Sequence, residues 1–128
     1  MATDIKLGKS KVKIKLKVED LPKLGLMVGD LENNANVLGN ILGGVASGDI
    51  LALLDVLHTL SDNGVTDEAI NEMVEDATPD DVEKAYTAVS DFFEKSPLTS
   101  KNAKLINKTI KGTMEDAIKN GAVTVNKE

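Results

Sequence analysis

Apolar and polar residues alternate along the start of the chain. Between residues 11 and 18 lysines separate the apolar side chains, which occupy every second position: Val12, Ile14, Leu16 and Val18. This period is typical of a strand with one buried face. Ile5 and Leu7 alternate in the same way, and Gly8-Lys9-Ser10 can turn the chain. Residues 3–18 are therefore predicted to form a β-hairpin.

The spacing of apolar residues changes to that of a helix at Asp20. Asp20 is a candidate N-cap, and Pro22 is tolerated in a first helical turn. Apolar residues then recur on one predicted stripe: Leu21, Leu24, Val28 and Leu31. Gly25 and Gly29 weaken this helix, because glycine costs about 1 kcal/mol against alanine in a helix interior.

A second helical pattern, between residues 37 and 45, is interrupted by glycines at positions 39, 43 and 44. The glycines predict a frayed or mobile segment that does not bury all of its apolar side chains. Leu38, Ile41 and Leu42 are therefore predicted to offer apolar surface for self-association or for binding a partner protein.

Helical patterns with clear starts occupy the rest of the chain. Residues 50–60 are apolar nearly all the way round and predict a central buried helix, with Ser47 as its N-cap and Leu54 in the core. Thr66 caps a short helix, and Thr78-Pro79-Asp80-Asp81 begins the next with a cap, a proline and two carboxylates. A last helix begins at Thr99 or Ser100 and carries a predicted buried stripe: Ala103, Ile106, Ile110, Met114 and Ala117.

These elements predict a mainly α (α+β) fold in a single domain over residues 1–128, a common domain size. A Lys-rich β element at residues 1–19, a small N-terminal hairpin or strand, is followed by about five helices in residues 20–120. Residues 121–128 are predicted to be a tail or a short strand.

Charge is divided unevenly along the chain, which carries 15 basic and 21 acidic residues for a net charge of −6. Residues 1–19 contain six lysines and two acids, residues 20–100 three lysines and 16 acids, and residues 101–128 six lysines and three acids. The chain has no Arg and only three aromatic residues, so base-reading nucleic-acid recognition is disfavoured. Without a targeting segment or about 20 consecutive apolar residues, we expect a cytoplasmic protein that does not cross a membrane.

The candidate chemical motifs each lack an essential residue. The glycines between 39 and 48 are not followed by the Lys and Ser/Thr of a phosphate loop, and a calcium loop around Gly64 would begin at Thr59 and end at Ile70. His58 is the only histidine, there is no cysteine, and adjacent acidic residues on a helix do not face each other. We therefore predict no catalytic residue, cofactor, metal site or small-molecule substrate, and no enzyme activity.

The order of these segments resembles that of the tail assembly chaperones of long-tailed phages and prophages of Gram-positive bacteria. The matching parts cover most of residues 11–107: the Lys-rich strand and the helix after it, then the segments 48–54, 62–70 and 92–98. The glycine-rich stretch from Gly39 to Gly48 departs from the family, which has a more ordinary helix there.

The resemblance implies a non-enzymatic protein that binds the aggregation-prone tape measure protein during tail building in the bacterial cytoplasm. Two alternatives remain open. One is a structural protein of the tail, with N-terminal strands exchanged between copies in a ring. The other is an acidic inhibitor or immunity-type protein that covers a basic surface with residues 20–100.

Overall fold

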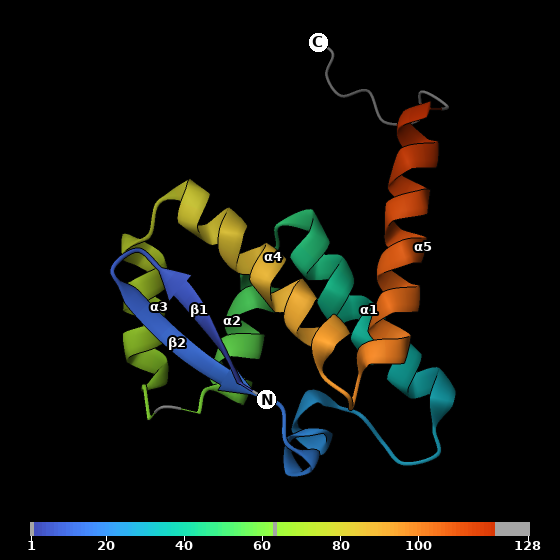
Figure 1. Cartoon of the computed structure of the whole chain (residues 1–128), viewed down its shortest axis with the longest axis horizontal. Helices are drawn as coiled ribbons and strands as arrows, with labels where there is room; N and C mark the ends of the chain where they lie inside the picture. The colour runs from blue at the N-terminus through green and yellow to red at the C-terminus, as the bar shows by residue number, and fades with distance from the viewer. Residues whose placement is uncertain (1, 63, 120–128) are drawn as a thin grey trace.

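The chain folds into an N-terminal hairpin followed by helices (Figure 1). The structure, a computed structural model, describes residues 2–62 and 64–119, and for residues 114–119 only the backbone. In chain order its elements are β1 (Ala2–Leu7), β2 (Ser10–Lys15), two 3-10 turns η1 (Val18–Asp20) and η2 (Pro22–Leu24), α1 (Leu31–Ser47), α2 (Ile50–Leu60), α3 (Asp67–Asp76), α4 (Pro79–Lys95) and α5 (Ser100–Lys119). The predicted α+β class, a hairpin followed by about five helices, is confirmed for the described residues, although two of the predicted helical segments differ from the observed ones.

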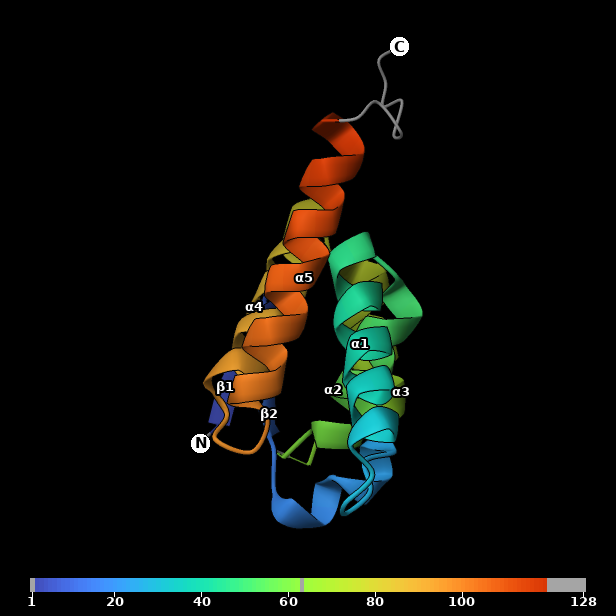
Figure 2. The ribbon, with the colours of Figure 1, turned by 90° about the vertical axis from the view of Figure 1, so that its right-hand side faces the viewer.

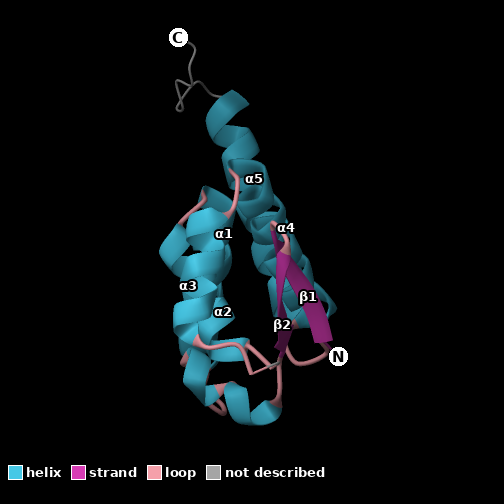
Figure 3. Cartoon of the chain, turned by 90° about the vertical axis from the view of Figure 1, so that its left-hand side faces the viewer, coloured by secondary structure: helices cyan, strands magenta, loops and turns pink. Residues whose placement is uncertain are grey.

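The elements form two layers, which are seen edge-on from either side (Figures 2 and 3). One layer holds the hairpin, α4 and α5, and the other holds α1, α2 and α3. The core lies between them, and its largest fully buried side chains come from both layers: Phe93, Ile5, Ile14, Leu53 and Leu57 among others. The end of α5 projects beyond both layers, so none of the other described elements covers this part of the helix.

The hairpin matches the alternating pattern that predicted it. β1 and β2 pair antiparallel, with Leu7 opposite Ser10 across the turn and Ile5 opposite Val12. Its apolar face packs on α4, and a backbone hydrogen bond from Asp62 N–H to Lys13 O (2.7 Å) attaches β2 to the chain after α2. Val18 was predicted on the same face but is 69% exposed, because the strand ends at Lys15 and the chain enters η1.

The helix predicted from Asp20 to Leu31 does not form. The chain makes η1 and η2 instead, and η2 ends at Gly25, whose φ of +97° is left-handed. Asp20 is buried and accepts a hydrogen bond from Lys17 N–H, so it satisfies the start of η1 rather than capping a longer helix. Val28 and Leu31, predicted on a buried stripe, are exposed.

The prediction of a frayed segment at residues 37–45 is also wrong. α1 runs without a break from Leu31 to Ser47, capped by the Asp30 side chain at its start. A Cβ built on Gly44 would lie 2.7 Å from the Cβ of Ala52, so this glycine permits a close approach of α1 to α2. Burial of one face of α1 against α2, α4 and α5 stabilises the helix despite its low helix propensity.

The remaining helices begin where the sequence predicted, with one correction. α2 covers the predicted 50–60, but its cap is Asp49, which accepts from Leu51 N–H, rather than Ser47. Thr66 caps α3, and Thr78 and Asp81 form a reciprocal capping box at the start of α4. The predicted tail or strand at 121–128 and the side chains of Met114 and Ala117 lie outside the described residues.

Candidate functional site

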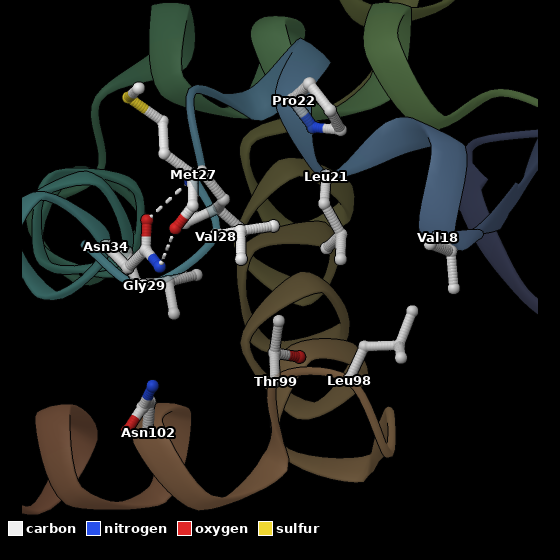
Figure 4. A pocket seen from close by; sticks show the side chains of 12 residues that line it. Val18, Leu21, Pro22, Met27, Val28, Gly29, Asn34, Leu98, Thr99 and Asn102 are labelled. Carbon is white, nitrogen blue, oxygen red and sulfur yellow. Dashed lines mark hydrogen bonds between the residues drawn. The ribbon is translucent and has the colours of Figure 1, made fainter. Parts of the chain in front are cut away.

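An apolar groove lies at the end of the molecule where the loop before α1 faces the turn between α4 and α5 (Figure 4). It has a volume of about 550 Å³ and no charged side chain among the residues that line it. Leu21, Met27 and Val28 form one wall, and Leu98, Thr99 and Asn102 form the other. Leu38 of α1 also lines the groove.

The apolar side chains of this groove are unusually accessible. Val28 is fully exposed, and Val18, Met27 and Leu98 are 69%, 59% and 42% exposed. Scattered single apolar residues are ordinary on protein surfaces, whereas a contiguous group around a hollow marks an interaction site. These four residues are called the groove rim below.

Two asparagines in the first turn of α1 hold the loop wall in place. The side chain of Asn34 accepts from Met27 N–H (2.7 Å) and donates to Met27 O (2.8 Å), while Asn33 donates to Gly25 O (2.8 Å). These bonds add to the backbone hydrogen bonds of the loop, such as Asp30 N–H to Met27 O, so Met27 and Val28 remain exposed on a fixed backbone. Gly29, with a φ of +76°, then turns the chain into α1.

The opposite wall is fixed by buried polar groups at the α4–α5 turn. The Thr99 hydroxyl donates to Phe93 O at 2.7 Å, and both Thr99 and Ser96 are buried. Leu98 lies between them in sequence and points outward. Asn102, one turn into α5, has an exposed side chain with no hydrogen bond to the described part of the chain. The groove therefore offers mostly apolar contact with one accessible amide.

The structure contradicts the exposure that was predicted for the candidate partner-binding residues. Leu38, Ile41 and Leu42 are only 2%, 9% and 1% exposed, because α1 is a complete helix that turns them into the core. Their predicted exposure is wrong, and of the three only Leu38 lines the groove. Helical spacing placed Val28 on a predicted stripe, whereas Gly25 and Gly29 indicate the loop that exposes it.

Ionisable groups lie outside the groove. Lys17 donates to Asp62 at 3.4 Å, and this hydrogen bond and the charge of Asp62 raise the pKa of Lys17. His58 is half-buried, and its Nε2 is hydrogen-bonded to the side-chain oxygen of Asn71 at 2.9 Å, which joins α2 to α3. Within residues 2–62 and 64–119 no three His, Cys, Asp or Glu side chains gather in a way that could hold a metal ion.

Burial raises the pKa of Tyr86, with the charges of Asp49 and Glu83 acting in the same direction. Its hydroxyl donates to Gly48 O at 2.8 Å and so joins α4 to the turn between α1 and α2. The hydrogen bond thus links the two layers away from the groove.

Comparison with protein-family models, curated proteins and solved structures gives no match to this chain. No helix in the described part of the chain is long and apolar enough to span a membrane.

Proposed function

We propose that this protein is a non-enzymatic tail assembly chaperone that binds the tape measure protein in the cytoplasm of a bacterial host. The observation that carries the proposal is the uncharged groove with its exposed rim of Val18, Met27, Val28 and Leu98. A chaperone for an aggregation-prone helical client needs apolar surface that stays accessible before the client arrives. The segment order that resembles this family supports the same function.

The groove suits the apolar stripe of a client helix. Its volume of about 550 Å³ is large enough for a few apolar side chains, such as those that recur at three- and four-residue spacing along one helix face. Both walls are held by hydrogen bonds, so little ordering of the groove is needed when a client binds.

The proposal is tested by coexpression with a helical fragment of the tape measure protein. The wild-type chain is expected to keep the fragment soluble, and Val28→Asp is expected to abolish this effect because it places a charge in the uncharged groove. Leu31→Asp is the matched control: Leu31 is 79% exposed but does not line this groove. Thermal unfolding should show that both variants remain folded.

Salt dependence separates this function from the inhibitor alternative. Raising salt from about 0.1 to 0.5 M shortens the screening length from about 10 Å to about 4 Å, which weakens exposed ion pairs and leaves apolar contacts nearly unchanged. The complex should survive 0.5 M salt. A complex that dissociates at 0.5 M salt and tolerates Val28→Asp would favour an acidic protein that covers a basic surface.

A further inference from the structure

A second groove, lined by apolar and polar side chains, lies between α2 and α3. Its volume is about 570 Å³. Leu51, which is 71% exposed, and the half-buried Leu54 and Val74 contribute apolar surface to it. The exposed Asp55 and Glu75 also line it, together with His58 and Asn71, whose side chains are hydrogen-bonded to each other. We call this the α2–α3 groove. Nothing in the described part of the chain fills it.

An exposed face of α5, whose Leu105 lines a shallow hollow with Gly39 of α1, has the opposite character. Leu105 is 57% exposed, and Lys101 and Lys108 stand one helical turn before and after it, both exposed. Residues four before and three after a helical position lie on the same face as that position, so the two lysines flank the leucine. Neither lysine forms an ion pair with any described residue.

The charges of the two surfaces are complementary. The α2–α3 groove lies in a stretch, residues 24–83, that contains no basic residue except His58, whereas residues 100–113 contain four lysines and no acid. An apolar side chain between two lysines therefore matches a groove whose lining combines apolar side chains with two carboxylates. Each exposed ion pair adds little to the affinity, but the pairs fix the orientation of α5 in the groove. Burial of the leucine supplies the larger part of the binding free energy.

The two surfaces cannot meet within one molecule. α5 belongs to the layer with α4 and the hairpin, and α2 and α3 belong to the other layer (Figures 2 and 3). We infer that α5 of one copy docks in the α2–α3 groove of a second copy, with Leu105 in the groove and Lys101 and Lys108 near Asp55 and Glu75. Because the two halves of the contact differ, each copy retains one free half, and the assembly closes as a ring or continues as an open chain.

The test uses two variants of the full-length chain in sedimentation velocity. Leu105→Asp places an acid against the acidic groove edges, and Leu51→Lys places a base against the incoming lysines. Each variant alone is expected to associate at least about tenfold more weakly than the wild type, which should form larger species as its concentration rises. Both residues are exposed, so thermal unfolding should change little.

A mixture of the two variants gives the decisive result. The Leu51→Lys copy retains an intact α5, and the Leu105→Asp copy retains an intact groove, so an equimolar mixture should form dimers and nothing larger. A wild type that stays monomeric at all concentrations would overturn the inference, and so would a mixture that stays monomeric. The inference does not depend on the proposed function, since neither variant alters the groove rim at Val28.

Discussion

Adjacent glycines in α1 should respond in opposite ways to the same substitution. A Cβ added at Gly43 would have no atom within 4 Å, whereas a Cβ added at Gly44 would lie 2.7 Å from the Cβ of Ala52. Both residues are inside α1, so both substitutions gain the same helix propensity. Only the second must also separate α1 from α2.

The magnitudes follow from these two contributions. Alanine in place of an unhindered helical glycine stabilises by about 0.5–1 kcal/mol, which is the expectation for Gly43→Ala. Forcing an extra methyl group into a packed interface costs about 1–3 kcal/mol, so Gly44→Ala should be destabilising by about 1 kcal/mol after its propensity gain. The two variants should therefore differ by about 2 kcal/mol in the free energy of unfolding.

Urea unfolding followed by circular dichroism measures both changes in a small domain of this kind. Ala52→Gly provides a further check, because it removes the methyl group that Gly44→Ala would meet. The double variant should be more stable than the sum of the single changes predicts. If Gly44→Ala stabilised the protein as much as Gly43→Ala, the close approach of α1 to α2 would be refuted.

Three further changes test the core and its pH dependence. Leu53→Ala should lower the free energy of unfolding by about 2–5 kcal/mol, and Leu54→Ala by less, because Leu53 is fully buried and Leu54 only partly; equal losses in urea unfolding would contradict this burial. Tyr86→Phe should cost about 1 kcal/mol by removing the hydrogen bond to Gly48 O. The pKa values of Tyr86 and Lys17 are raised in the folded state, so the stability that these two groups contribute is fully present below pH 10 and is lost as the pH rises further. The free energy of unfolding of Tyr86→Phe should therefore fall less steeply above pH 10 than that of the wild type. An equal fall would argue against the contribution of the tyrosine.

Much of the fold could be predicted because local chemistry and tertiary packing agree in most elements. The alternating residues of β2, the Thr78-Pro79 start of α4 and the apolar residues 50–60 each match their elements. α1 was mispredicted because its glycines lower helix propensity locally, whereas burial against three other helices determines the outcome. The Gly44–Ala52 approach joins positions whose proximity depends on the turn between two helices, which the pattern of one helix does not reveal.

The groove was harder to predict than the fold. Its two walls come from residues 18–29 and 98–102, which are distant in sequence and meet only when α5 packs beside α1. Helical spacing predicted that Val28 lies in a helix, and the glycines of residues 39–44 predicted that Leu38 is exposed. The structure shows the reverse, because the helix begins only at Leu31 and then continues through these glycines. The left-handed glycines at 25 and 29 end η2 and redirect the chain, and this placed Val28 on the rim.

Calorimetric titration with a helical tape measure fragment, in parallel for the wild type and Val28→Asp, tests the central claim most directly. Binding by the uncharged groove predicts a wild-type dissociation constant that changes little between 0.1 and 0.5 M salt. Val28→Asp should weaken binding at least about tenfold at both salt concentrations. Equal affinity of the two proteins for the fragment, or the absence of binding by the wild type, would contradict the assignment of this groove as the client site.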